Sequence, residues 1–218
     1  MTNETDHGVA EAPVHDDDRQ AWDQRYRERE RVWTGHPNAP LIDEVEHIVT
    51  PGTALDVGCG EGADAVWLAR AGWLVTAVDL SSTAVERARA HAQEAGVSHH
   101  VSFTDEDLAT LVDSHGPWNL VTSMYTHPAR GGRWLVETLA PAVAPGGMLL
   151  VVAHHPSDPH AQEHPELLAK TFTAEDVAGA LDRSQWEVSA TLRERTTREA
   201  NGRERLWRDS VLVARRHD

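Results

Sequence analysis

A glycine-rich turn offers the clearest chemistry in the chain. It reads LDVGCGEG over residues 55–62 and completes a short apolar segment. Glycines in such a turn let the backbone bend sharply and approach a ligand closely, at the edge where open α/β sheets bind small molecules. Asp56 stands two positions before Gly58, where its carboxylate would repel a pyrophosphate but suit an ammonium group. The turn therefore predicts a site for a small ligand that carries a positive charge.

Two further carboxylates follow the next two apolar segments. Asp79 ends the segment 74–79 and lies about 20 positions after Gly58, a spacing typical of an acid that binds ribose hydroxyls. Asp107 follows a third segment, 100–103, and offers a carboxylate to an adenine amino group. Because parallel strands end at the same edge of a sheet, we expect the three places to converge on an adenosine-like ligand.

The elements that must position these residues alternate between apolar and amphipathic segments, which predicts a parallel sheet covered on both faces. Predicted strands cover 54–57, 74–78, 100–103, 119–123 and 148–153, and predicted helices cover 63–71, 82–95, 131–143 and 174–182. Gly96 and Gly146 stand where helices should end. Two longer strands, 186–197 and 206–215, should meet across Asn201-Gly202, a favoured tight-turn pair. We expect a doubly wound, Rossmann-like α/β fold with a mostly parallel seven-stranded sheet and a C-terminal antiparallel hairpin.

The first fifty residues differ from the rest. Residues 1–18 hold almost no large apolar side chains and end in three aspartates, so we expect a disordered acidic tail. A helix should begin at Arg19 and end near the breaker-rich stretch 35–40. A second short helix should carry one apolar face with Leu41, Ile42, Val45, Ile48 and Val49. Residues 19–218 are expected to form one domain, with the helical segment 19–50 in front of the sheet.

Composition limits the partners. The chain has 218 residues, and 20 Lys and Arg against 35 Asp and Glu give a formal net charge of −15. This charge disfavours nucleic acid and anionic membranes as partners. Cys59 is the single cysteine, no apolar run approaches the roughly 20 residues that span a bilayer, and a signal-peptide core is missing. We expect a cytoplasmic protein with a small-molecule substrate; its oligomeric state is left open.

A nicotinamide dinucleotide is the alternative ligand, because Gly58, Gly60 and Ala63 also satisfy the dinucleotide pattern with alanine in third place. Against it stand Asp56 beside the turn, the additional Gly62, the helices before the turn, and too little length for a substrate domain. These features favour S-adenosylmethionine, whose methionine part carries an ammonium group.

In combination, the Asp-x-Gly-Cys-Gly-x-Gly turn and the strand end Val-x-Ala-Val-Asp-Leu-Ser resemble the class I S-adenosylmethionine-dependent methyltransferases, over about residues 22–216. More loosely, Trp22-Asp23-x-x-Tyr26, Val32-Trp33 and Pro37-Asn38 are similar to the small tellurite-resistance-type and thiopurine-type enzymes. The resemblance implies transfer of a methyl group by in-line displacement, with S-adenosylhomocysteine as the product.

The resemblance also assigns roles. The glycines of the turn, with the backbone of Cys59, would cradle the amino-acid part of the cofactor, the acid at 79 would hold the ribose, and the acid at 107 would hold the adenine. The N-terminal helix would form a lid whose aromatic residues, Trp33 among them, shelter the sulfonium. The implied cofactor site comprises Trp22, Tyr26, Asp56, Gly58, Cys59, Gly60, Gly62, Asp79, Leu80, Asp107, Leu108 and Ser123.

A general base is needed only when the methyl acceptor carries a proton. His127 is the first choice, because it closely follows the fourth strand and imidazole titrates near neutrality. The acceptor atom stays open among oxygen, nitrogen, sulfur and a chalcogen. Besides the NAD-dependent enzyme, a protein that binds the cofactor without catalysis is the other alternative.

The histidine-rich insert 154–164 invites a metal hypothesis, since His154, His155, His160 and His164 lie close together in the sequence. Prolines interrupt the run, and neither cysteine pairs nor a His-Glu-x-x-His motif accompany it. No metal is therefore expected, and the insert should instead shape the acceptor site.

Overall fold

The structure is a computed structural model that describes residues 16–30, 32, 35–198 and 204–218. Residues 1–15 of the expected tail, Trp33 and the expected turn at Asn201-Gly202 lie outside the described residues. The strands are β1 (Thr53–Val57), β2 (Leu74–Val78), β3 (Val101–Thr104), β4 (Trp118–Met124), β5 (Val143–His154), β6 (Trp186–Arg198) and β7 (Glu204–Arg216). The helices are α1 (Asp16–Arg27), α2 (Ala39–Val45), α3 (Ala63–Arg70), α4 (Ser82–Glu94), α5 (Leu108–Ser114), α6 (Gly131–Leu139), the 3₁₀ turn η1 (Ala140–Ala142), α7 (Pro159–Glu163), α8 (Pro165–Leu168) and α9 (Ala174–Ala178).

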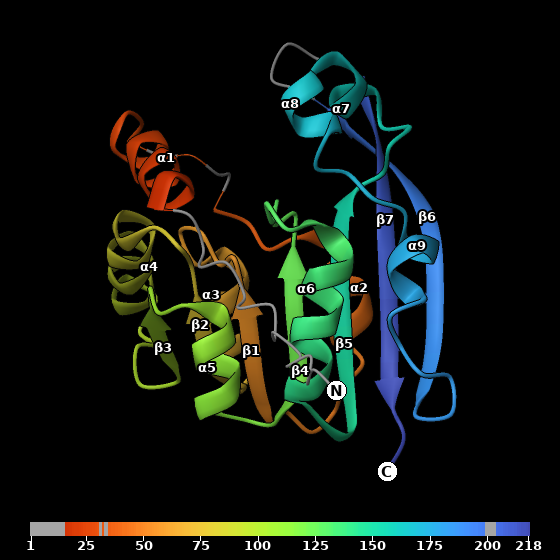
Figure 1. The fold of residues 1–218 in the computed structure, drawn as a ribbon. Coiled ribbons are helices and arrows are strands. Elements are labelled where there is room, and N and C mark those ends of the chain that lie inside the picture. Colours follow the sequence, from red (N-terminus) through yellow and green to blue (C-terminus); the bar gives the residue numbers. More distant parts are fainter. Residues whose placement is uncertain (1–15, 31, 33–34, 199–203) are drawn as a thin grey trace, which may run out of the picture.

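The seven strands form one sheet in the order β3-β2-β1-β4-β5-β7-β6 (Figure 1). The pairs from β3 to β5 are parallel, whereas β7 runs antiparallel to both β5 and β6. The predicted fold class is confirmed. In the register of the parallel strands, Val57 of β1 lies opposite Val78 of β2 and Ser123 of β4, so these strands reach the same edge together.

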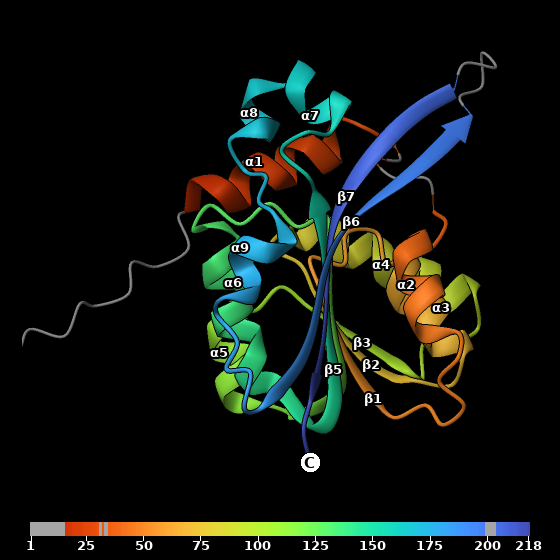
Figure 2. The ribbon, with the colours of Figure 1, turned by 90° about the vertical axis from the view of Figure 1, so that its right-hand side faces the viewer.

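Helices cover both faces of the sheet, with α2, α3 and α4 on one face and α5, α6 and α9 on the other (Figure 2). Each face has its own apolar core. One contains Leu41, Leu68 and Val85, and the other contains Leu135 and Val177. Burial of β-branched and leucine side chains on both faces of β1, β4 and β5 stabilises the sheet, by about 25 cal/mol per Å² of apolar surface removed from water. The helices α1, α7 and α8 lie beyond the carboxyl ends of the parallel strands (Figure 1).

Several expected boundaries are wrong. The helix α1 runs from Asp16 to Arg27, whereas the expected helix began at Arg19 and ended near residues 35–40. Because α2 ends at Val45, Val49 is 94% exposed instead of lying on an apolar face.

Other errors surround prolines and short helices. Pro141, which lacks a backbone N–H, follows the end of α6 at Leu139, so this helix is shorter than the expected 131–143. Gly146 lies inside β5, with φ of 70°, and does not end a helix. The helices α5, α7 and α8 were absent from the expected elements, since runs of four to seven residues have too few positions to show a period.

Among the described residues, every helix is either too short or too polar to pass through a lipid bilayer.

Candidate functional site

The glycine turn is joined to the end of β2 through its backbone. The amides of Gly58 and Cys59 both donate to the carbonyl of Val78, at 2.8 and 3.0 Å. Gly58 has φ of 73°, and a Cβ at this position would meet Thr126 Oγ1 at 2.5 Å. Gly62 has φ of 85°, and its Cβ would meet the Cβ of Ala88 at 2.9 Å. Glycine is therefore required at both places for conformation and for space.

Asp79 meets the turn directly. One carboxylate oxygen, Oδ2, accepts from the amide of Gly60 at 2.8 Å, and Oδ1 accepts from the amide of Ser81 at 2.9 Å. Burial raises the pKa of Asp79, while these two amide hydrogen bonds act in the opposite direction. The expected meeting of the turn with the acid that follows the second strand is thus present.

The end of β3 belongs to the same edge. Arg19 of α1 donates to the carbonyl of Leu80 at 2.6 Å and to the carbonyl of Asp105 at 3.0 Å, so it bridges the segments that follow β2 and β3. Asp107 is the N-cap of α5, and its Oδ1 accepts from the amides of Ala109 and Thr110 at 3.1 and 3.2 Å. Its contact with adenine, like that of the half-buried Leu108, stays a prediction.

Asp56 is buried beside a second carboxylate that the sequence analysis did not single out. Only 2% of Asp56 is exposed; its Oδ1 accepts from Thr122 Oγ1 at 3.2 Å, and Oδ2 has no hydrogen-bond partner among the described residues. Burial raises the pKa of Asp56 well above its usual value, and the charge of Asp64 raises it further. An unpaired buried carboxylate oxygen suits a ligand that brings a positive charge, such as the ammonium group of S-adenosylmethionine.

Asp64 and Glu61 attach the N-terminal segment to the turn. Asp64 accepts two hydrogen bonds from Asn38, one from the amide and one from Nδ2, both at 2.7 Å. Glu61, which is 5% exposed, forms an ion pair with Arg87 of α4 at 2.9 Å and accepts from the amide of Val32 at 3.1 Å. We call the pair Glu61 and Arg87 the latch.

The latch also reaches the end of α1. Arg87 Nη2 donates to the carbonyls of Tyr26 and Arg29 at 2.6 and 2.8 Å. Tyr26 is 2% exposed, and its ring centroid lies 6.3 Å from that of the half-buried Trp22. Asp23 joins α1 to the start of α4: it accepts from Ser81 Oγ at 2.5 Å and from the amide of Thr83 at 3.2 Å. The segment that was expected to act as a lid is thus hydrogen-bonded to the cofactor edge.

A chain of hydroxyls connects β4 with β1. Ser123 Oγ donates to Thr126 Oγ1 at 2.8 Å, and Thr126 Oγ1 donates to the carbonyl of Val57 at 3.0 Å. Ser123 is buried, and its role toward a cofactor stays a prediction.

Cys59 is half-buried, and burial together with the nearby carboxylates raises the pKa of its thiol well above the usual value. The thiol therefore stays protonated, which does not favour a nucleophilic role.

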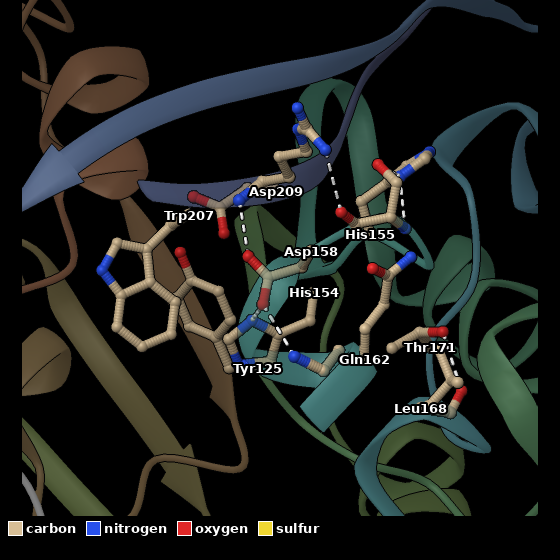
Figure 3. Close-up of polar contacts among 12 residues, drawn as sticks. Tyr125, His154, His155, Asp158, Gln162, Leu168, Thr171, Trp207 and Asp209 are labelled. Atoms are coloured by element: carbon tan, nitrogen blue, oxygen red, sulfur yellow. Dashed lines mark hydrogen bonds and ion pairs between the residues drawn. The ribbon is translucent and has the colours of Figure 1, made fainter. Parts of the chain in front are cut away.

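Rings gather beyond the ends of β4 and β5. His154 is central: its ring centroid lies 5.0 Å from that of Tyr125, 6.0 Å from His127, 5.7 Å from Trp207 and 6.1 Å from His160. Figure 3 shows Trp207, Tyr125 and His154 with their rings side by side. We call Tyr125, His127, His154 and Trp207 the ring cluster.

The ring cluster is uncharged near neutral pH. Burial lowers the pKa of His127 to about 4, with smaller contributions from His154, Lys170 and Arg25. Burial also lowers the pKa of His154, and it raises the pKa of Tyr125. His127 is therefore a neutral imidazole that can accept a proton.

The hairpin of β6 and β7 supplies residues that the sequence analysis missed. Arg195 Nε donates to Asp209 Oδ2 at 2.7 Å, and its Nη2 donates to the hydroxyl of Tyr125 at 3.1 Å. Its guanidinium carbon lies 5.0 Å from the ring centroid of Trp207. No local motif indicates Arg195, Asp209 or Trp207. These residues come close to Tyr125 and His154 only when the hairpin pairs with β5.

Comparisons with known proteins point to one family. Residues 54–147 match a family model described as a methyltransferase domain. The 2-heptyl-1-hydroxyquinolin-4(1H)-one methyltransferase of Mycobacteroides abscessus is 28% identical over 159 residues, which cover 67% of this chain and 70% of that protein. A ubiquinone biosynthesis O-methyltransferase of a Caulobacter species is 39% identical over 100 residues, 44% of this chain but only 38% of that protein.

The fold agrees with this match. Magnesium protoporphyrin IX methyltransferase from Synechocystis, solved with bound S-adenosylhomocysteine, superposes with a TM-score of 0.64 and 21% identity over 92% of this chain and 94% of that one. The methyltransferase domain that residues 54–147 match argues against the NAD alternative and agrees with S-adenosylmethionine as the cofactor. The glycine turn with its acids, the strand order and the domain matched over residues 54–147 are those of a class I S-adenosylmethionine-dependent methyltransferase.

Proposed function

We propose that this methyltransferase methylates an acidic hydroxyl on a planar aromatic small molecule. The observation that carries the proposal is the ring cluster, whose members lie at the carboxyl end of β4 and β5, next to the strand that leads into the glycine turn. Aromatic side chains bind planar rings by offset or edge-to-face stacking, which contributes about 0.5–1.5 kcal/mol per pair. Two relatives, a 2-heptyl-1-hydroxyquinolin-4(1H)-one methyltransferase and a ubiquinone biosynthesis O-methyltransferase, support the same class of acceptor.

One group of residues would bind the cofactor, and a second group would bind the methyl acceptor. When bound, S-adenosylmethionine supplies a methyl group that its sulfonium already activates. The glycine turn, Asp56 and Asp79 would hold it, with Asp107, Leu108 and Ser123 at the same edge and the segment with Trp22 and Tyr26 as its cover. The ring cluster would hold the acceptor. Alignment of the two partners supplies much of the rate, because well-oriented groups reach effective molarities of about 10⁵ M or more.

His127 would act as the general base that removes the proton of the acceptor. A base with a pKa of about 4 is always unprotonated near neutrality, but it is weak. It therefore suits a hydroxyl that is itself acidic, such as a phenol or an N-hydroxy group on a ring, better than an aliphatic alcohol.

A transfer assay tests the proposal. The purified full chain is incubated with methyl-labelled S-adenosylmethionine and a panel of hydroxyquinolines, catechols, thiols, aromatic amines and tellurite. We expect label on the ring hydroxyls, and His127→Ala should lower kcat by about 100-fold while leaving the Kd for S-adenosylhomocysteine unchanged.

The exposed His115 provides the matched control, and His115→Ala should keep full activity. Transfer to thiols, amines or tellurite alone would contradict the acceptor class, and unchanged turnover in His127→Ala would end its role as a base. Cofactor binding without any transfer would support the non-catalytic alternative.

A further inference from the structure

The segment between β5 and α9 folds into two short helices that bring histidines together. In the sequence its prolines argue against a metal site, whereas in the structure Pro159 and Pro165 occupy the first positions of α7 and α8. Proline is favoured there, because its fixed φ suits a helix and its missing N–H is not needed. His160 lies in α7 and His164 is the extended residue between α7 and α8, and their ring centroids are 4.4 Å from each other.

Glu163 completes a set of three donors. One ligand atom from each of His160, Glu163 and His164 lies within 4.8 Å of the other two. The centre of a triangle with sides of that length is about 2.8 Å from each corner, whereas zinc lies about 2.0–2.2 Å from nitrogen and oxygen ligands. Small side-chain rotations therefore close the set around an ion. Two imidazoles with one carboxylate are a donor set typical of zinc sites that keep an open position.

The surroundings leave these donors available. Nδ1 of His160 is buried and has no hydrogen-bond partner within the described part of the chain. Nδ1 of His164 lies 3.6 Å from Glu166 Oε1, and a carboxylate beside the second ring nitrogen is the usual support of a metal-bound imidazole. Glu163 is exposed, so an ion can reach the three residues from solvent.

Asp158 fixes the helix that carries the donors. Its Oδ1 accepts from the amide of Ala161 at 3.0 Å, and its Oδ2 accepts from the amide of Arg208 at 2.6 Å, which attaches α7 to β7 (Figure 3). The side chain of Asp158 is fully buried, and both of its oxygens are engaged by backbone amides. The scaffold of the three donors is thereby positioned before any ion binds.

We propose that His160, Glu163 and His164 bind one divalent transition-metal ion, with Zn²⁺ as the best match to the donors. Three protein ligands leave a coordination position for water or for an oxygen atom of a bound small molecule. The ring centroid of Trp207 lies 5.3 Å from that of His160, so the ion would adjoin the ring cluster. The proposal is independent of the methyl acceptor.

Metal titration of the full chain without an affinity tag tests the site. Zn²⁺ binding is measured by competition with a chromophoric chelator, and Co²⁺ is used as an optical probe of coordination. We expect one ion per chain and a Co²⁺ absorption band that shifts when azide is added, because azide would occupy the open position. Loss of an outer-shell partner costs about 10–100-fold in affinity, so His160→Ala and His164→Ala should weaken binding at least as much. Glu163→Gln, a conservative change at an exposed position, should weaken it by about tenfold or more.

His115→Ala, which removes an exposed imidazole elsewhere, should bind as tightly as the wild type. Circular dichroism of each variant separates loss of the ligand from loss of the fold. The proposal is overturned if the chain binds no ion, or if His160→Ala, Glu163→Gln and the His115→Ala control all bind like the wild type. A Co²⁺ band that azide leaves unchanged overturns the open position.

Discussion

Asp56 lies in a position of the fold that disfavours the ionised form of its carboxyl group. The sequence places it beside the turn, and the structure buries it with Asp64 nearby and one oxygen unpaired among the described residues. A carboxylate so placed costs stability when it is ionised. Such a cost is tolerable where a cationic ligand repays it, which supports the assignment of Asp56 to the cofactor.

Asp56→Asn should therefore separate stability from binding. A raised pKa means that the folded chain holds the proton more tightly than the unfolded chain, so this contribution to stability is complete below the ordinary pKa of 3.8 and is lost as the pH rises. We expect the variant to equal or exceed the wild type in free energy of unfolding at pH 7, with a smaller difference at pH 4. Its affinity for S-adenosylhomocysteine should fall at least tenfold, or about 1.4 kcal/mol. Urea unfolding and calorimetry measure the two effects, and a variant that is less stable at pH 7 yet binds normally would refute this view.

His127 offers a second test at the same scale. Burial is the largest cause of its lowered pKa, and His154 of β5, Lys170 between α8 and α9, and Arg25 of α1 lower it further. Because the lowered pKa lies at about 4, this imidazole should stay neutral while ordinary histidines titrate near 6.5. NMR titration of the histidine ring signals, assigned by comparison with His127→Ala, should show no transition for His127 between pH 5 and 8. A midpoint near 6.5 would contradict the buried, uncharged cluster.

Among single residues, those whose type alone indicates a backbone conformation or a ligand could be predicted from the sequence. Gly58 and Gly62 lie in left-handed conformations against Thr126 and Ala88, as a ligand-binding turn requires. Glu61, Asp64 and Arg87 could not be found in this way, because charged residues in or beside a helix are most often solvated. Only tertiary contacts give them partners.

At the scale of elements, the latch holds the N-terminal segment against the turn. Arg87→Met should remove the 2.9 Å ion pair with the buried Glu61 carboxylate, and loss of one partner of a buried ion pair typically costs about 3–5 kcal/mol. Since Arg87 is one quarter exposed, we expect the lower end of that range. The double variant Arg87→Met with Glu61→Gln should recover part of the loss, because it also removes the negative charge that Arg87 balances.

Thermal unfolding of the wild type, Arg87→Met, Glu61→Gln and the double variant measures the coupling between Glu61 and Arg87. Proteolysis at low protease concentration then reports on the segment itself, and the Arg87→Met chain should be cleaved near residues 28–38 before the wild type is. Additive effects of the two substitutions, with unchanged cleavage, would show that the latch does not hold the segment.

Elements with a clear apolar period were predicted better than those whose bounds depend on pairing between strands. The strands β1 and β2 and the helices α3 and α4 lie within one or two residues of the predicted ranges, since their apolar periods are clear. The 12-residue β5 begins well before the predicted 148, because it pairs with β4 through a register shift around a Pro-Gly-Gly stretch that resembles a loop. Pairing between strands, rather than local preference, sets this boundary.

For the whole molecule, the topology could be predicted because parallel strands with short connections allow few arrangements. What the sequence could not show is the contribution of the hairpin. Antiparallel pairing of β7 with β5 brings Trp207 beside His154, and pairing of β6 with β7 brings Arg195 to Tyr125, across more than fifty positions of chain. The acceptor side is therefore a product of the complete sheet.

The proposed cofactor site is the edge formed by the glycine turn and Asp79. Calorimetry of the full chain with S-adenosylhomocysteine and with NAD tests it most directly, using Asp79→Asn and the exposed Asp113→Asn as a matched pair. We predict one bound S-adenosylhomocysteine per chain, no measurable NAD binding, an affinity at least about tenfold lower in Asp79→Asn and no change in Asp113→Asn. Binding of NAD in its place, or equal affinity for S-adenosylhomocysteine in all three proteins, would contradict the account.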